Sequence, residues 1–321
     1  MPTFSIIIPV YNRPDEIMEL LDSLCQQTNT DFEIIVIEDG SNLTCAKVVE
    51  DYASKLNISY HFKENSGQGF SRNYGAVDAK GDWLVFFDSD CVIPERYIEN
   101  LSKLIEVENF KAFTGPDAAR NDFSSLQKAI SYSMTSFLTT GGIRGKKVKV
   151  DKEAHLRSYN LVILKDVFQE LGGFRKTNMG EDMELSHRFG KSGYKALVTD
   201  EIKVFHKRRN TLWSFFKQVF SFGRTRIQLN RVYRIPIKIP HLLPASFTLG
   251  FVFTVLLTSF IPSIGLVFLS VYGAYFLMIL FHSTVSMRSL VAGFLAVITT
   301  FVQHLGYGLG FIKEVLIPSK P

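Results

Sequence analysis

Acidic and basic residues are distributed unevenly along this chain of 321 residues, and this constrains its fold more than any other feature. Glu314 is the only acid after residue 201. A stretch with nine Lys or Arg and no acid, 207–240, is followed by three apolar segments, roughly 242–261, 264–281 and 289–312. Each is close to the ~20 residues that a helix needs to cross a bilayer. We therefore predict a water-soluble domain over 1–206, basic interfacial helices over 207–240 and about three transmembrane helices over 241–321.

The connections between the apolar segments favour membrane helices over the alternative, which is buried helices of a soluble protein. The first connection, Pro262–Ser263, is short enough for a helical hairpin, and the second contains Arg288. Three crossings would put Arg288 on the same side as 207–240, in agreement with the retention of positive charge in the cytosol. The N-terminal run FSIIIPVYN is too short for a signal peptide. We expect an integral protein of the cytoplasmic membrane whose soluble domain is cytosolic.

The three cysteines, Cys25, Cys45 and Cys91, are odd in number and irregularly spaced. This pattern is typical of a reducing compartment and gives no disulfide framework. Cys91 follows two acids closely, so it is either a small buried residue or a member of a metal site.

Apolar runs alternate with segments of helical periodicity over the first 115 residues. The runs 4–11, 32–40, 58–62, 83–87 and 111–115 are predicted strands, and 14–27, 44–56, 69–79 and 94–106 are predicted helices. Continuously apolar strands separated by helices indicate an α/β fold with a parallel sheet covered on both faces. Residues 116–157 look irregular, and the basic stretch 141–150 is a candidate loop over the site. Ordered structure is expected again over 159–174 and 178–194.

Polar residues follow three of the predicted strands, in the sequences PVYN, EDGS and DSD. In such sheets a ligand binds outside the carboxyl ends of the strands, so these residues should share one crevice. Asp88 and Asp90 are two residues apart, and alternate side chains of an extended segment point the same way. Both carboxylates could hold Mg2+ or Mn2+, which would neutralise a diphosphate leaving group. The alternative is a turn with two solvated acids.

Asp39 ends the second of these strands, and its carboxylate could accept a hydrogen bond from a base or a ribose. The alternative is a turn acid before Gly40. The segment ENSGQGFSRNYG contributes a glycine-bearing turn and Arg72, which could hold phosphates. A simple helix-capping turn would explain the same segment.

Glu181 and Asp182 begin a predicted helix, where the helix dipole favours acids in any case. In a functional interpretation, one of these carboxylates is the general base that takes a proton from an acceptor hydroxyl. His206 ends the sequence EIKVFH and is either a core or surface histidine or a third metal ligand beside the aspartates.

The basic stretch 207–240 interleaves its cations with aromatic residues, a composition that nucleic-acid-binding segments also have. Because it directly precedes the apolar segments, we expect it instead at the membrane interface near anionic lipid headgroups. Some of its cations could hold the phosphates of a donor or of a lipid acceptor.

In combination, these motifs resemble the family 2 glycosyltransferases. The sequences SIIIPVYNRPDEIMELLDSLCQQT, FEIIVIEDGS, NSGQGFSRNYGAVDAKGDWLVFFDSD, LGGF and GEDMELSHRFGKSGY occur in the order of the family, over about residues 3–206. The resemblance implies the GT-A fold, which is Rossmann-like with a mostly parallel sheet. It also implies an inverting transfer from a nucleotide-sugar, which we expect to be a UDP- or GDP-sugar.

By this resemblance, the following residues have roles. Pro9, Tyr11 and Asp39 look like nucleoside contacts. Asp88 and Asp90 look like the metal-binding pair, with Asp88 close to the donor. Asp182 looks like the catalytic base, and Glu181 would place the acceptor.

The layout is similar to that of membrane-attached members that extend lipid-linked or exported polysaccharides. The segment after Gln218 departs from the Gln-x-x-Arg-Trp motif of processive synthases, since the next arginine is Arg224 and no Trp follows. We therefore expect transfer to a hydroxyl of a lipid-linked or polysaccharide acceptor, with membrane lipids as further partners and no nucleic acid. One alternative is transfer directly to polyprenyl phosphate. Another is a non-catalytic membrane scaffold with a degenerate sugar-nucleotide fold.

Overall fold

The computed structural model describes residues 2–118, 123–141, 149–151, 155–176, 179–206 and 209–319. The chain divides into two compact units. The sheet unit comprises Met1–Ala118 and Lys147–Lys207, and the helical unit comprises Ala119–Lys146 and Arg208–Pro321. The boundaries predicted at residues 206 and 240 remain predictions, and residues 142–148 of the predicted loop lie outside the described residues.

The sheet unit is built on an eight-stranded sheet with the order β3-β2-β1-β4-β9-β6-β10-β8. Its strands are β1 (Phe4–Val10), β2 (Phe32–Asp39), β3 (Ile58–Lys63), β4 (Trp83–Phe87), β6 (Ala112–Thr114), β8 (Lys149–Asp151), β9 (Asn160–Leu164) and β10 (Ala196–Val198). The first four strands pair in parallel, as do β6 and β10. β9 is antiparallel to both β4 and β6, and β8 is antiparallel to β10. The predicted α/β class is confirmed, with a mixed sheet.

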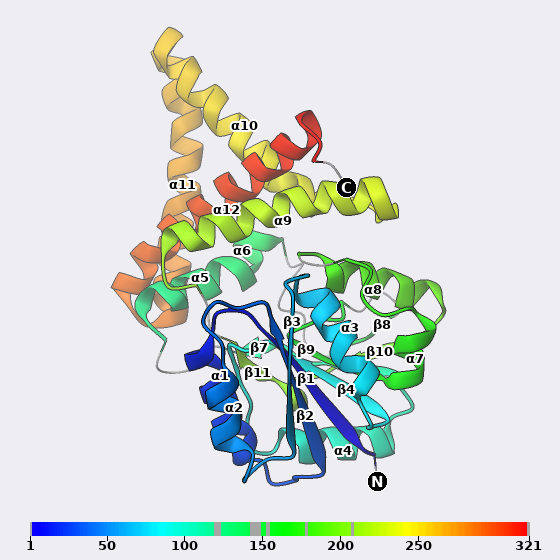
Figure 1. The fold of residues 1–321 in the computed structure, drawn as a ribbon. Coiled ribbons are helices and arrows are strands. Elements are labelled where there is room, and N and C mark those ends of the chain that lie inside the picture. The colour runs from blue at the N-terminus through cyan, green and yellow to red at the C-terminus, as the bar shows by residue number, and fades with distance from the viewer. Residues whose placement is uncertain are drawn as a thin grey trace. The chain divides into compact units, whose positions relative to one another are not determined.

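Helices cover both faces of this sheet because successive residues of a strand point to opposite sides. Phe4, Ile6, Ile8 and Val10 of β1 pack in a cluster with α1 (Pro14–Cys25), α2 (Ala46–Tyr52) and α4 (Tyr97–Val107). Ile7 of β1 packs in a second cluster with α3 (Gln68–Asp78), α7 (Lys165–Glu170) and α8 (Glu181–Lys191). Figure 1 shows α1 and α2 on one side of the strands and α3, α7 and α8 on the other. The carboxyl ends of β1, β2 and β4 therefore lie at one edge between two apolar layers.

A second, three-stranded sheet gathers residues that are distant in the sequence. It consists of β5 (Cys91–Val92), β11 (Val204–His206) and β7 (Asp117–Ala118), with the 3₁₀ helix η1 (Asp200–Ile202) just before β11. His206 is paired with Cys91 in its register, and Val204 with Asp117. This pairing brings His206 next to the segment that holds the two aspartates after β4.

The helical unit contains α5 (Ser125–Thr135), α6 (Phe137–Thr140), α9 (Leu212–Tyr233), α10 (Ile239–Phe260), α11 (Pro262–Met287) and α12 (Leu290–Leu316). The prediction that residues 116–157 are irregular is wrong for α5. This helix begins with a capping box, in which the Ser124 hydroxyl accepts from the Gln127 amide and the Gln127 side chain accepts from the Ser124 amide. Both hydrogen bonds satisfy amides that a helix start leaves unpaired.

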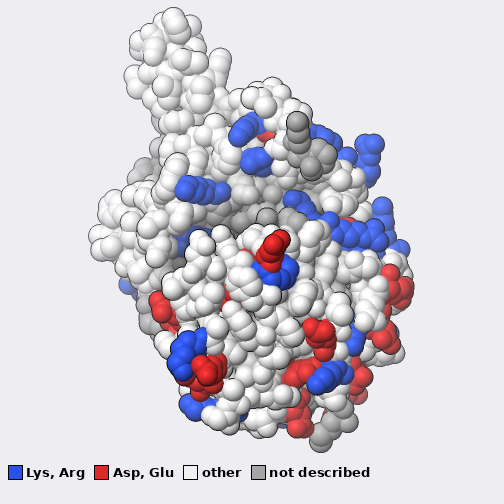
Figure 2. Space-filling model, viewed as in Figure 1, with Lys and Arg blue, Asp and Glu red and all other residues white. Residues whose placement is uncertain are grey.

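Three helices of this unit, α10, α11 and α12, are long and apolar enough to cross a membrane. A single residue, Ile261, separates α10 from α11, and the two helices pack together. Neither helix contains a charged residue, and in Figure 2 both are white. Arg288 ends α11 in the left-handed conformation, with φ of 50°. The three apolar segments predicted from the sequence thus correspond to three candidate membrane helices.

Helices α9 and α12 approach each other closely because glycines line their contact. A Cβ atom added to Gly310 would lie 2.0 Å from the carbonyl oxygen of Phe220, and one added to Gly223 would lie 2.1 Å from that of Tyr307. Further along the same pair of helices, Glu314 of α12 is fully buried and forms ion pairs with Arg224 and Arg231 of α9. The basic stretch predicted before the membrane segments is therefore tied, through α9, to the last of them.

Candidate active site

Asp39 lies at the end of β2, where the chain approaches the start of α3. Its carboxylate accepts hydrogen bonds from Lys63 Nζ at 2.5 Å and from the amides of Ser66 and Gly67 at 2.9 and 2.8 Å. Burial alone would raise the pKa of Asp39, but the bonds from Lys63 and the two amides outweigh it and lower the pKa. Asp39 is therefore an ionised acid that fixes the turn before α3.

Two further residues predicted for the nucleoside flank the end of β1. Pro9 is partly buried and pairs with Ile37 of β2 in the register of the sheet. Tyr11 is 50% exposed, so its ring is open to a ligand. Asn12 follows with φ of 54°, and its side-chain oxygen accepts from the amides of Asn42 and Leu43. The ends of β1 and β2 are thus tied together beside Tyr11.

Arg72 of α3 connects the acid after β4 to the acid at the start of α8. Its side chain is fully buried, and its guanidinium contacts Asp88 and lies 3.1 Å from Glu181 Oε1. The same Glu181 oxygen accepts from Gln68 Nε2 at 2.7 Å and from Ser158 Oγ at 3.1 Å. Burial, and then the charge of Asp182, raise the pKa of Glu181 to about 7. Arg72, predicted as a phosphate contact, is engaged by two carboxylates.

Asp90 has different partners from Asp88, although the two are only two residues apart. Arg13 Nη1 donates to Asp90 Oδ2 at 2.7 Å, and His206 Nε2 lies 3.0 Å from Asp90 Oδ1. Burial would raise the pKa of Asp90, but His206 and Arg13 lower it well below the usual range. Burial would likewise lower the pKa of His206, but Asp90 and the other acids nearby raise it.

The same cluster has the donor atoms that a metal ion needs. Asp90, Cys91 and His206 each offer one ligand atom, and these atoms lie within 4.8 Å of one another. Among the described residues, His206 Nδ1 is buried without a hydrogen-bond partner, and Asp90 Oδ1 is buried with His206 Nε2 close to it but without a well-directed hydrogen bond. Burial raises the pKa of Cys91, which keeps its sulfur a thiol and a weak ligand. A carboxylate and an imidazole remain. The carboxylate suits Mg2+ or Mn2+, and the imidazole suits transition-metal ions such as those of iron or zinc.

Asp182, the second residue of α8, has both oxygens occupied by protein donors. Met183 N donates to Asp182 Oδ1 at 2.7 Å, and His155 Nε2 lies 3.2 Å from Asp182 Oδ2. Burial alone would raise the pKa of Asp182, but His155, the Met183 amide and the charge of Arg72 lower it. Asp182 is thus ionised, beside a Glu181 whose pKa is raised.

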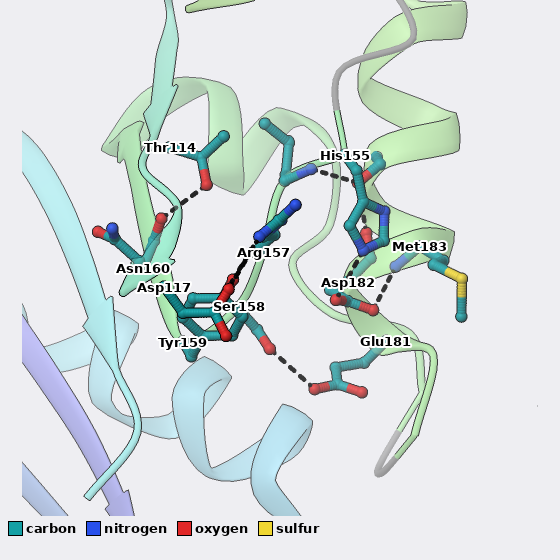
Figure 3. A network of polar contacts seen from close by, with 12 residues as sticks. Thr114, Asp117, His155, Arg157, Ser158, Tyr159, Asn160, Glu181, Asp182 and Met183 are labelled. Atoms are coloured by element: carbon teal, nitrogen blue, oxygen red, sulfur yellow. Dashed lines mark hydrogen bonds and ion pairs between the residues drawn. The ribbon is translucent and has the colours of Figure 1, made fainter. Parts of the chain in front are cut away.

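The segment before β9 reaches several of these groups, as Figure 3 shows. His155 contacts Asp182, Ser158 donates to Glu181, and Arg157 donates to the Tyr159 hydroxyl at 2.7 Å. The ring of Tyr159 in turn packs against that of His206, with ring centroids 4.8 Å apart and the planes tilted by 33°. Sequence reasoning missed Arg13, His155, Arg157 and Tyr159, since they belong to no spaced pattern of acids or glycines.

Comparisons with known proteins show what this chain is similar to. The family model described as "Glycosyl transferase family 2" matches residues 5–172. The succinoglycan biosynthesis protein ExoA of Rhizobium meliloti is 26% identical over 321 aligned residues, which cover 97% of this chain and 94% of that protein. An uncharacterised glycosyltransferase of Haemophilus influenzae is 42% identical over 104 residues, 32% of this chain and 34% of that protein's length.

Two solved structures share the fold. One is the mannosyltransferase PcManGT of Pyrobaculum calidifontis in complex with GDP-Man and Mn2+, with a TM-score of 0.59 and 16% identity over 99% of this chain and 88% of that one. The other is a fragment of TarS from Staphylococcus aureus in complex with UDP-GlcNAc, with a TM-score of 0.52 and 20% identity over 70% of this chain and 65% of that one. Because the family model matches more than half of the chain, the chain belongs to glycosyl transferase family 2.

Proposed function

We propose that the chain transfers a sugar, with inversion at the anomeric carbon, from a nucleotide-sugar to a hydroxyl of a lipid-linked glycan in the synthesis of a cell-surface polysaccharide. The similarity to ExoA over nearly the full length of both proteins supports a role in polysaccharide synthesis. The three apolar helices support an acceptor that is held at a membrane.

One observation carries the proposal: buried Arg72 joins Asp88 to Glu181. Asp88 belongs to the acids that would lie on the donor side, and Glu181 precedes the acid that would act on the acceptor. A transfer in a single displacement needs the leaving group and the nucleophile on either side of one carbon atom. The shared arginine keeps the two sets of acids at a fixed separation.

On the donor side, Asp39, Pro9 and Tyr11 would contact the nucleoside of a UDP- or GDP-sugar. A divalent cation such as Mn2+ or Mg2+, held by Asp88, Asp90 and His206, would neutralise the diphosphate as it leaves. Arg72 would serve this site by fixing the Asp88 carboxylate, because its guanidinium is already engaged by two acids.

On the acceptor side, Asp182 would take the proton of the attacking hydroxyl. The acceptor oxygen then forms a bond to the anomeric carbon, and the bond from that carbon to the β-phosphate oxygen breaks. Its electron pair leaves with the nucleoside diphosphate. Asp182 suits this role because its lowered pKa leaves it ionised and able to accept a proton. Glu181 would place the acceptor.

We further propose that the enzyme is integral to the cytoplasmic membrane, with the sheet unit in the cytosol. The basic residues of α9 and Arg288 would then lie on the cytosolic side. Helix α9 would lie along the interface, where anionic headgroups attract its cations.

The test is Asp182→Asn, assayed in membranes that contain the full chain, a panel of UDP- and GDP-sugars and Mn2+. We expect release of nucleoside diphosphate to fall by about 10²–10⁴-fold, the usual contribution of a general base. Donor binding, followed by thermal shift of the purified protein, should persist. Asp166→Asn is the matched control, since Asp166 is an exposed acid in the first turn of α7.

Retained turnover in Asp182→Asn would contradict the base role. If added polyprenyl phosphate accepted the sugar equally well in this variant, the acceptor would be a phosphate, which needs no base. If the wild type bound no donor and released no nucleoside diphosphate with any sugar of the panel, the catalytic proposal itself would fail.

A further inference from the structure

His155 lies where it can control the orientation of the proposed base. Its Nε2 is 3.2 Å from Asp182 Oδ2, whereas the other carboxylate oxygen accepts from the Met183 amide. The Met183 bond is local to α8, and His155 comes from a different segment of the chain. A carboxylate held at both oxygens cannot rotate freely about its Cβ–Cγ bond, so its remaining lone pairs point in fixed directions (Figure 3).

The backbone next to His155 is anchored to the same turn of α8. The amide of Leu156 donates to Ser186 Oγ at 2.9 Å, and Ser186 Oγ donates to the carbonyl of Asp182 at 2.6 Å. The Leu156 side chain is buried in the core with α7 and α8. Two residues further along, Ser158 binds Glu181. The contact between His155 and Asp182 is thus one of several interactions that join this segment to the start of α8.

The exposure of the two side chains suits a supporting role. The side chain of Asp182 is 21% exposed and can still be reached by an acceptor, whereas that of His155 is 46% exposed. Within the described part of the chain, the other charged groups that act on Asp182 are Arg72 of α3, Arg157 of the segment before β9 and the adjacent Glu181. Both arginines are engaged by other partners, Arg72 by Asp88 and Glu181, and Arg157 by Tyr159 and Asp117.

We propose that His155 is a positioning residue of the transfer reaction, which donates through Nε2 to Asp182 and aims this carboxylate at the acceptor hydroxyl. The inference rests on the proposed function, since it needs Asp182 to be the base. The proton of the acceptor passes to Asp182, and His155 neither forms nor breaks a bond to the substrate. A donor on one oxygen stabilises the ionised carboxylate and keeps it ready to accept that proton.

The experiment compares His155→Ala and His155→Gln with the wild-type chain in the same membrane assay. We expect His155→Ala to lower kcat by about a hundredfold, the cost of a catalytic group misplaced by about 1 Å, with the KM for the donor unchanged. The acid limb of its pH profile should move to higher pH, because Asp182 loses a partner that lowers its pKa. Glutamine offers an N–H donor near the position of Nε2, so His155→Gln should recover most of kcat.

His61→Ala is the matched control, since His61 of β3 also faces an aspartate, Asp78, but at 3.9 Å and outside the proposed site. It should leave kcat and the pH profile unchanged. Thermal unfolding of all variants identifies any that fail to fold.

Three outcomes would overturn the inference. Wild-type kinetics in His155→Ala, with Asp182→Asn inactive, would remove the role of His155 and leave the proposed function standing. An equal loss in His155→Ala and His155→Gln with no shift of the acid limb would indicate a merely structural role. Full activity of Asp182→Asn would remove both the base and its positioning residue.

Discussion

Each unit contains a buried charged side chain that pairs with two groups of opposite charge, Arg72 in the sheet unit and Glu314 in the helical unit. Arg72, in the sheet unit, is a fully buried cation between two carboxylates, those of Asp88 and Glu181. Glu314, in the helical unit, is a fully buried carboxylate between two guanidiniums, those of Arg224 and Arg231. Each group pairs twice because a single buried charge without partners costs several kcal/mol.

The two clusters differ in how completely their polar atoms are satisfied. Glu314 also accepts from the amide and hydroxyl of Ser319, both at 2.8 Å, and from Gln228 Nε2 at 3.3 Å. Arg72 Nε, by contrast, is buried without a hydrogen-bond partner among the described residues. Near it, burial and then the charge of the adjoining Asp182 raise the pKa of Glu181. The buried charge of the helical unit is therefore fully paired and serves structure. The charged groups of the sheet unit are incompletely paired, as is common in active sites.

The largest expected effect comes from Arg72→Met. Among the described residues, the change leaves Glu181 buried with the neutral donors Gln68 and Ser158, and it removes the guanidinium that contacts Asp88. We expect the sheet unit to lose about 3–5 kcal/mol, the usual cost of breaking a buried ion pair from one side. Hydrogen exchange followed separately in α8 and α12 of the full chain measures the loss, which should appear in α8 and spare α12.

The companion change Glu181→Gln in the Arg72→Met background removes the unpaired buried charge and should restore part of the stability. If the single variant kept wild-type protection in α8, Arg72 would contribute no net stability. It would then not be comparable with Glu314 as a stabilising buried charge.

A smaller effect is expected from Glu314→Gln. Here the buried charge itself is removed, and Arg224 and Arg231 are 30% and 39% exposed, so water can solvate them. Glutamine still accepts from Ser319, so we expect a loss of about 1.5–3 kcal/mol, that of a hydrogen bond to a charged group. Protection in α12 should fall and that in α8 should stay the same.

Removing the two arginines instead of the acid tests whether Glu314 depends on its ion pairs. Arg224→Ala combined with Arg231→Ala keeps the buried acid and removes both cations, so it should destabilise α12 more than Glu314→Gln does. Equal losses in the two variants would mean that the Glu314 charge is not costly to bury, contrary to the comparison.

Much of the sheet unit is predictable from its sequence because its strands and helices have clear periods. β4 (Trp83–Phe87) coincides with the predicted run 83–87, and α1 starts at Pro14 with two acids in its first turn, as predicted. The reversed direction of β9 could not be predicted, because no local pattern distinguishes an antiparallel from a parallel buried strand. Helix α5 had a sequence signal, Ser124 followed three residues later by Gln127, which the prediction did not use.

The candidate site was predictable in its acids and unpredictable in their partners. Asp39, Asp88, Asp90, Glu181 and Asp182 stand out because acids after buried strands or in a first helical turn form visible patterns. His155 lies 27 positions before Asp182 in a segment without periodicity, and Arg13 reaches Asp90 across 77 positions. Such pairings depend on how the chain returns to the sheet, which spacing alone does not encode.

The smallest expected effect is a dependence of the Arg72→Met cost on pH. The pKa of Glu181 is raised in the folded protein, so its proton is bound more tightly there than in the unfolded chain, and this contribution to stability is lost as the pH rises through about 7. Without the charge of Arg72, which lowers this pKa, the pKa should rise further, and a tenfold change in proton affinity corresponds to about 1.4 kcal/mol. At about pH 5, Glu181 is protonated with or without the arginine, so only Asp88 loses its partner. At about pH 8, Glu181 is ionised in the wild type, and the substitution leaves it either charged without its cation or obliged to take up a proton. The loss of stability in Arg72→Met, measured by hydrogen exchange in α8, should therefore be larger at the higher pH by roughly 1 kcal/mol. Glu314→Gln is the reference variant, because it removes the acid of its cluster. A cost that stays constant with pH, or that grows on acidification, would mean that Arg72 acts on Asp88 alone and that the two acids are not joined through it.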